Sequence, residues 1–307
     1  MAHRTPPAGL RDEPAKGIAY MLAAIALFSV MTAMVKAMGA TYPVGQLMFF
    51  RNAAALPPVL VILAGTGGLG SFRTRRPLAH VLRSVLGMGA MGSGFFAVTL
   101  MPLVDATALS FTQPMFLTLL AIPLLGERVG LHRAGAVAAG FAGVLVLSVG
   151  QGGFGGSIGP VGLAAALLNA FISACTALLI RRLSATESSA TITAWQSALM
   201  AAFCSLLLPF GWVTPGPRDL ALLGGIGLSG GVAQYWMTQA YRFGAASMVS
   251  AFTYTGIVWA TLLGVLVWHE VPGPSVLVGA AIVIAAGLYI LHREVFLARR
   301  RRSQPPR

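Results

Sequence analysis

Uncharged polar side chains fall in the middle of long apolar segments of the sequence, where they could bind a solute. In the segment 159–180, Asn169, Ser173 and Thr176 have the spacing i, i+4, i+7, so a helix places all three on one face. An amide or hydroxyl that faces lipid is costly, because nothing there replaces its hydrogen bonds to water. These groups therefore face neighbouring helices or a cavity.

Similar polar groups, together with aromatic rings, recur in the other apolar segments. We predict that they line one substrate site, which consists of Phe28, Thr32, Arg51, Gln113, Asn169, Ser173, Gln234, Tyr235, Thr238, Tyr254 and Trp259. A nearly neutral, amphipathic site of this kind suits a zwitterion or a flat ring better than a phosphate, which requires several arginines. For each polar residue, ordinary hydrogen bonding between helices is the alternative interpretation.

Arg51 is the charged member of this set. It lies inside the segment 44–64, and Lys36 lies near the end of the segment 17–38 on the same side of the membrane. Either side chain can extend to the membrane surface and remain hydrated there. The alternative is that one of them binds a substrate carboxylate, and Arg51 is the better candidate because it lies further from its helix end.

The eight acidic residues avoid the centres of the apolar segments, so a proton relay at mid-membrane lacks its carboxylate. Glu127 and Glu270 occupy corresponding ends of two segments, each just before a new helix. We interpret both as anions near the N-terminus of the helix that follows, where unpaired N–H groups favour negative charge. A role in gating or proton coupling is the alternative.

The sequence lacks a recognisable catalytic or metal-binding set. His269-Glu270 begins like a zinc-protease motif, but Gly273 stands where the second histidine is required. The two cysteines, Cys175 and Cys204, lie in apolar segments without metal-ligand spacing. We therefore expect no cofactor, no metal ion and no enzymatic activity.

The elements that must position these residues are membrane-spanning helices. The chain is 9% charged and 56% hydrophobic, with a mean hydropathy of +0.79, which excludes water as its main solvent. A helix of about twenty apolar residues crosses the hydrocarbon core of a bilayer. Ten such segments are predicted, namely 17–38, 44–64, 80–101, 104–125, 131–149, 159–180, 190–212, 219–241, 245–268 and 273–292.

The basic residues predict the orientation. Of the 21 lysines and arginines, all but Lys36, Arg51 and Arg218 fall in the tails or loops of one side. By the positive-inside rule we predict both termini in the cytoplasm of a bacterial cell, with the chain in the inner membrane and lipid as its surroundings. The basic run at 299–302 then anchors the C-terminal tail, so we expect no nucleic-acid partner.

The sequence also repeats itself. The stretches 105–127 and 248–270 each begin with small and hydroxyl residues, continue as a long apolar run and end in glutamate, and a glycine-spaced helix follows each. A unit of five helices is odd, so the second copy enters the membrane from the opposite side. The predicted fold is an all-α membrane protein with a tail 1–16, a five-helix repeat 17–149, a loop 150–158, a second repeat 159–292 and a basic tail 293–307.

These motifs resemble those of the EamA-type ten-helix carriers in the drug/metabolite transporter superfamily, over residues 17–292. The resemblance rests on Lys36, Phe49, Phe50, Arg51, Asn52, Pro102, Leu103, Ala106, Pro114, Gly126, Glu127, Gly135, Gly143, the run 240–246, Glu270, Gly279 and Gly287. Gly256-Ile257 departs from the family pattern, which often has a proline there. The resemblance implies a secondary transporter that works by alternating access.

The same resemblance implies a small-molecule substrate. Export or facilitated movement of amino acids, the aromatic ones included, is our first expectation. The alternative is an importer of a vitamin-like or nucleoside-like metabolite such as riboflavin or S-adenosylmethionine. A membrane-embedded enzyme is a third and less favoured interpretation.

Overall fold

The computed structural model describes residues 13–67, 74, 76–125, 131–150, 159–183, 189–243 and 252–303, and within these ranges the chain is helical without strands. The α-helices are α1 (Pro14–Met38), α2 (Val44–Ala53), α3 (Leu56–Gly67), α4 (Pro77–Leu100), α5 (Leu103–Ser110), α6 (Gln113–Leu125), α7 (Leu131–Gly150), α8 (Pro160–Leu183), α9 (Ser189–Ser205), α10 (Pro217–Phe243), α12 (Gly256–Trp268) and α13 (Pro274–Ser303). Two 3-10 helices, Leu208–Phe210 and Phe252–Thr255, complete the described elements.

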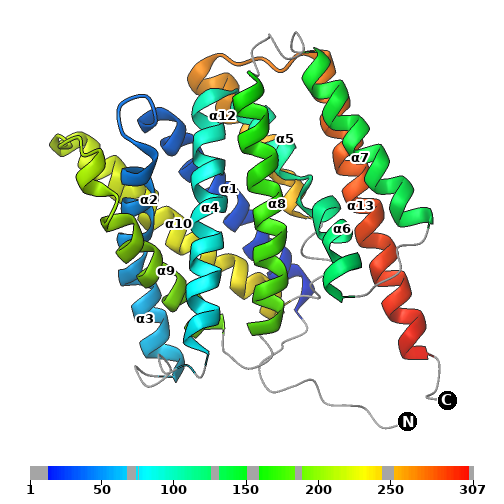
Figure 1. Ribbon diagram of the computed structural model, residues 1–307, viewed down its shortest axis with the longest axis horizontal. Helices are drawn as coiled ribbons and strands as arrows, with labels where there is room; N and C mark the ends of the chain where they lie inside the picture. Colours follow the sequence, from blue (N-terminus) through cyan, green and yellow to red (C-terminus); the bar gives the residue numbers. More distant parts are fainter. Residues whose placement is uncertain are drawn as a thin grey trace.

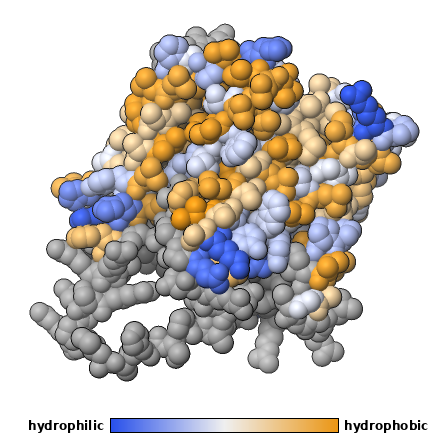
Figure 2. All heavy atoms as spheres, turned by 180° about the vertical axis from the view of Figure 1, so that it is seen from behind, coloured by the Kyte–Doolittle hydropathy of each residue, from blue (hydrophilic) through white to orange (hydrophobic). Residues whose placement is uncertain are grey.

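The described helices form a bundle of membrane-crossing length. Seven segments are long and apolar enough to cross a bilayer, and Ala134–Leu147 and Phe252–Trp268 are shorter apolar helices. Together with α10 they give ten segments, in agreement with the sequence. Hydrophobic residues cover much of the face seen in Figure 2, and smaller hydrophilic patches lie at its top, its sides and its lower middle. The chain is thus a multi-pass membrane protein.

Two of the predicted segments are broken rather than continuous. The segment expected at 44–64 is divided between α2 and α3 just before Pro57, and the one expected at 104–125 is divided between α5 and α6 just before Pro114. In a helix, the N–H of each residue donates to the carbonyl oxygen of the residue four positions earlier. Proline has no N–H to donate, and its ring clashes with that carbonyl group. The breaks therefore follow from prolines that hydropathy does not register. In contrast, α13 is longer than predicted: it continues to Ser303, into the stretch expected to be a tail.

The helices pack in pairs that join the two halves of the chain. The first helix of one half lies along the third helix of the other, because α1 packs on α10 and α8 packs on α4. The fifth helices, α7 and α13, pack on each other at one side of the bundle (Figure 1). A Cβ on Gly279 would lie only 2.7 Å from the Gly143 carbonyl oxygen, so glycine is needed for this close approach.

Both ends of the described chain lie at one end of the bundle, where α1 begins and α13 ends (Figure 1). We call this the termini end. The other end, where α1 stops at Met38 and α5 begins at Leu103, is called the opposite end.

Candidate functional site

A cavity of about 320 Å³ lies among α1, α4, α5, α8 and α12. It is lined by Ile25, Phe28, Ser29, Thr32, Ala90, Met91, Gly94, Phe95, Ala97, Val98, Leu103, Ala106, Thr107, Ser110, Phe111, Ala166, Asn169, Thr253, Gly256 and Ala260. Both halves of the chain contribute, and the residues from α1 come from the middle of that helix. The volume is at the lower end of the roughly 300–1,000 Å³ typical of ligand pockets, so it fits a small metabolite.

One face of α1 forms a wall of the cavity. Ile25, Phe28, Ser29 and Thr32 have the spacing 0, 3, 4, 7 and so share this face. The Ser29 hydroxyl donates to the Ile25 carbonyl oxygen at 2.9 Å, and the Thr32 hydroxyl donates to the Phe28 carbonyl oxygen at 2.8 Å. Since each hydroxyl hydrogen is used within the helix, the oxygens remain as acceptors toward the cavity.

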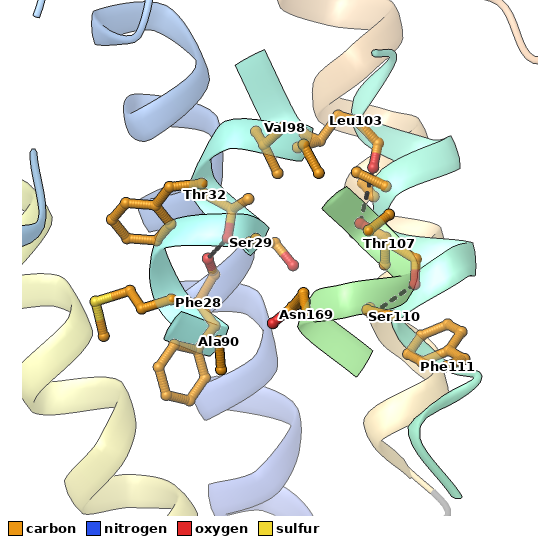
Figure 3. A pocket seen from close by; sticks show the side chains of 18 of the residues that line it. Phe28, Ser29, Thr32, Ala90, Val98, Leu103, Thr107, Ser110, Phe111 and Asn169 are labelled. Carbon is orange, nitrogen blue, oxygen red and sulfur yellow. Dashed lines mark hydrogen bonds between the residues drawn. The ribbon is translucent and has the colours of Figure 1, made fainter. Parts of the chain in front are cut away.

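The short helix α5 presents the same chemistry from the other side. The Thr107 hydroxyl donates to the Leu103 carbonyl oxygen at 2.8 Å, and the Ser110 hydroxyl donates to the Thr107 carbonyl oxygen at 2.7 Å. Figure 3 shows these two hydroxyls across the cavity from Thr32 on α1. The cavity thus places hydroxyl acceptors on two sides of a bound solute.

Asn169 on α8 lies between these two walls (Figure 3). Gly94 on α4 makes room for it, because a Cβ there would lie 3.1 Å from Asn169 Cγ. The Ser173 hydroxyl donates to Asn169 Oδ1 at 3.3 Å. Among the described residues no acceptor bonds to Asn169 Nδ2, so the amide N–H groups are available as donors.

The rest of the lining is apolar and aromatic. Phe28, Phe95 and Phe111 supply rings, and Phe111 meets Tyr254 edge to face with ring centroids 4.9 Å apart. None of the described residues that line the cavity is charged. Hydroxyl acceptors and ring faces both attract an ammonium or another N–H donor. The site suits a solute with an amino group and no large net charge.

The opposite end of the bundle is held together above this cavity by an ion pair. Lys36 Nζ bonds to Glu270 Oε1 and donates to the Met101 carbonyl oxygen at 3.1 Å. The Leu103 N–H, the first in α5, donates to Glu270 Oε2 at 3.1 Å. The two side chains are only 11% and 22% exposed. This Lys36–Glu270 pair therefore joins α1, the end of α12 and the start of α5 beside the cavity-lining Leu103.

The pair corrects two interpretations made from the sequence. Lys36 does not extend to the membrane surface, because its ammonium is held by Glu270. Glu270 does lie at a helix N-terminus, but at that of α5 rather than that of the helix that follows it in the chain. Glu127 lies outside the described residues.

Two more contacts join elements at the same end. The Tyr42 hydroxyl donates to Asp219 Oδ2 at 2.7 Å, which ties the connection between α1 and α2 to the start of α10. Gln46 exchanges two hydrogen bonds with the Val213 backbone, at 2.8 Å and 3.0 Å. Together with the Lys36–Glu270 pair, these contacts close the opposite end across both halves of the chain.

Comparison with known proteins then identifies the family. The model of the EamA-like transporter family matches residues 15–149 and again residues 160–292. The chain belongs to the EamA-like transporter family. Members of this family in the drug/metabolite transporter superfamily move small molecules across membranes, so the protein is a small-molecule transporter.

Named relatives transport chemically different solutes. The chain is 29% identical to the pseudopaline exporter of Pseudomonas aeruginosa over 88% of its length and 94% of the relative. It is 29% identical to the S-adenosylmethionine uptake transporter of Rickettsia prowazekii over 91% and 93% of the two lengths. It is 34% identical to the riboflavin transporter of Rhizobium johnstonii, over 64% of each.

A solved crystal structure shares the fold of this EamA-like transporter. It superposes with a TM-score of 0.63 at 22% sequence identity, over 94% of this chain and 99% of the other. At that identity the likeness concerns the fold alone.

The structure separates the predicted site residues into groups. Phe28, Thr32 and Asn169 line the cavity, and Ser173 holds the Asn169 amide. Tyr254 packs against Phe111, and its hydroxyl occupies the space that a side chain at Gly287 would fill. Ser173 and Tyr254 are not themselves part of the described lining, and neither are Arg51, Gln113, Gln234, Tyr235 and Trp259. The side chain of Thr238 is outside the described part of the chain.

The lining also includes residues that sequence reasoning did not select. Ser29 and Thr107 supply acceptors, and Gly94 supplies the space for Asn169. Ser29 was detectable, because it lies one helical turn after Ile25 and beside Phe28 on the α1 face. Nothing in the sequence distinguishes Gly94 from the other glycines, of which the chain has 37 in all.

Arg51 is buried in the middle of this transporter. It is 8% exposed, and its guanidinium carbon lies 3.1 Å from where a Cβ on Gly230 would be. Gly230 is the central residue of α10, so Arg51 does not extend to the membrane surface, contrary to the first interpretation. Its Nε has no hydrogen-bond partner among the described residues. Burying a guanidinium whose Nε lacks such a partner is costly.

Proposed function

We propose that the protein is a secondary carrier that moves small amino-bearing metabolites, amino acids foremost, through the central cavity. The observation that carries the proposal is the composition of the cavity wall. Four hydroxyl oxygens on Ser29, Thr32, Thr107 and Ser110 act as acceptors, the Asn169 amide is a donor, and the phenylalanine rings provide apolar faces. An α-ammonium fits the acceptors and the ring faces, and a compact side chain fits the remaining volume.

The proposed mechanism is alternating access with the opposite end closed in this structure. The Lys36–Glu270 pair would break when that end opens, and the cavity would then exchange solute with the other side. None of the charged residues lines the cavity in the described part of the chain, so we propose that transport follows the gradient of the solute itself.

The proposed location is the inner membrane of a bacterium, with both termini in the cytoplasm. The excess of lysine and arginine at the termini end supports this orientation. The opposite end, with the Lys36–Glu270 pair, then faces the periplasm. Export or facilitated movement of the metabolite is the direction that we propose.

Import of a larger vitamin-like or nucleoside-like solute is the second candidate. It is favoured by the names of two relatives, a riboflavin transporter and an S-adenosylmethionine uptake transporter. The cavity volume of about 320 Å³ favours the smaller solute. The two candidates are distinguished by loading expressing cells with mixed metabolites and analysing the medium by mass spectrometry. Our proposal requires that these cells lose amino acids faster than empty-vector cells do. Faster uptake of riboflavin would support the second candidate.

Asn169→Ala is expected to raise the half-saturating solute concentration roughly tenfold, because one amide–solute hydrogen bond is worth about 1–1.5 kcal/mol. The thermal stability should hardly change, since the described contact of this side chain is one 3.3 Å bond from Ser173. Exchange in liposomes and thermal unfolding in detergent measure the two effects. Gln234→Ala is the matched control, because the same amide is removed outside the cavity lining. A loss of stability with unchanged half-saturation would make Asn169 a purely structural residue.

A further inference from the structure

The cavity-lining face of α4 continues toward the termini end as a polar face. Residues at spacings of four and three share one side of the helix, and here that side carries His80, Ser84, Gly87, Met91, Gly94 and Val98. The last three line the cavity. The first three lie one to three turns closer to the start of α4. Ser84, two turns before Met91, is roughly 10 Å from it along the helix at 1.5 Å per residue.

The polar part of this face is fully buried. His80 is 1% exposed and Ser84 is 0% exposed, and the neighbouring Arg83 is 6% exposed. The Ser84 hydroxyl and two nitrogens of Arg83, Nε and Nη1, have no hydrogen-bond partner in the described part of the chain. The sequence placed Arg83 with the basic loop residues, but it lies inside α4 and does not reach solvent. A bound anion would offset the cost of burying a guanidinium at such a site.

The helix α9 supplies further groups at this level. The His80 ring stacks on Trp195 with centroids 5.5 Å apart, and a Cβ on Gly87 would lie 3.6 Å from Gln196 Nε2. Arg83 and Ser84 lie in the turn of α4 between these two contacts. Gln196 Nε2 has Met200 Sδ at 3.6 Å, and a thioether is a weak acceptor. Helical spacing thus places the Arg83 guanidinium and the Ser84 hydroxyl within one turn of the level at which Gln196 meets α4.

We propose that Arg83, Ser84 and Gln196 form a carboxylate-binding site on the cytoplasmic side of the central cavity, in addition to that cavity. The inference rests on the proposed function for its orientation and its solute. A guanidinium binds a carboxylate through two parallel charge-assisted hydrogen bonds, and the hydroxyl and amide can donate to the remaining lone pairs. The central cavity selects the amino group of the solute, whereas this site selects its carboxylate before or after passage.

The test uses benzoate and benzamide, which share a ring but differ in the carboxylate. Benzoate is expected to raise the melting temperature of the purified full-length protein, and benzamide is not. Arg83→Met should weaken benzoate binding roughly ten- to hundredfold, the effect of losing a charge-assisted hydrogen bond. Arg83→Met should also raise the melting temperature without ligand, because it removes an uncompensated buried charge.

Matched variants keep the test decisive if Arg83→Met folds poorly. Ser84→Ala and Gln196→Ala remove single donors without changing the charge, and each should weaken benzoate binding several-fold. Arg76→Met removes an exposed arginine just before α4 and should change nothing. A benzoate effect that is absent from the wild type, or equal in Arg83→Met, would overturn the proposal.

Two further outcomes are distinguishable. In the first, native mass spectra show phosphatidylglycerol retained by the wild type but not by Arg83→Met, and benzoate has no effect. That result would assign the site to a lipid headgroup and overturn the proposal. If amino acids cross liposomes but benzoate binding does not depend on Arg83, only the carboxylate site fails. If benzoate binds through Arg83 but no amino acid crosses, the proposed function fails and the anion site stands.

Discussion

Glu270→Gln is expected to open the periplasmic end of the cavity. A cysteine introduced at Thr107, which lines the cavity, should react with an impermeant thiol reagent from the periplasm roughly ten- to hundredfold faster in the Glu270→Gln background. The reason is that Lys36 loses its charged partner, and a hydrogen bond between charged groups is worth about 1.5–3 kcal/mol. Glutamine keeps an acceptor for the Leu103 N–H, so the start of α5 remains capped.

The labelling is measured by mass shift in a background with Cys175 and Cys204 replaced by serine, because both are free thiols. Glu13→Gln is the matched control. Glu13 pairs with Lys16 at 3.6 Å at the termini end, with side chains 45% and 48% exposed, so its loss should leave the labelling rate unchanged. Equal labelling of Thr107→Cys with and without Glu270→Gln would show that the pair does not control access.

Arg51→Met is expected to separate transport from stability. Transport should fall roughly a hundredfold if the guanidinium binds the carboxylate of the solute during passage, since a charge-assisted hydrogen bond is worth up to about 3 kcal/mol. The free energy of unfolding should rise by about 1–4 kcal/mol, because methionine fills the space without an uncompensated charge. Exchange in liposomes and thermal unfolding give the two values.

Arg218→Met serves as the control, since Arg218 is exposed at the start of α10. Neither transport nor stability should change there. Lower stability of Arg51→Met together with normal transport would identify Arg51 as a structural residue without a part in transport.

The membrane fold was predictable because hydropathy directly identifies the apolar segments that cross a bilayer. The orientation predicted from the basic residues stays a prediction. The stripe on α8 was predictable for a similar reason, since helical spacing places Asn169 and Ser173 on one face. Spacing says which residues share a face but not which neighbour that face meets. Gln234 and Thr238 share a face of α10 by the same rule, yet the described lining of the cavity does not include Gln234.

Contacts between distant parts of the chain were beyond sequence reasoning. Lys36 and Glu270 are 234 residues apart, and neither sequence context indicates the other. The burial of Arg83 was missed because it lies near the start of the predicted segment 80–101, where an arginine usually reaches water. For Arg51, further inside its segment, the sequence left both interpretations open. The space at Gly94 depends on how closely α4 approaches α8, which only packing determines.

The central claim is that an amino-bearing solute crosses through the cavity, and exchange in liposomes tests it most directly. Purified protein is reconstituted with a mixture of the standard amino acids inside, and entry of the labelled mixture is followed beside that of the N-acetylated forms. We predict that at least one amino acid enters faster than into protein-free liposomes, more slowly with Asn169→Ala, and that its N-acetylated form does not enter. Equal entry of the N-acetylated form, or no entry of any amino acid above the protein-free control, would contradict the account.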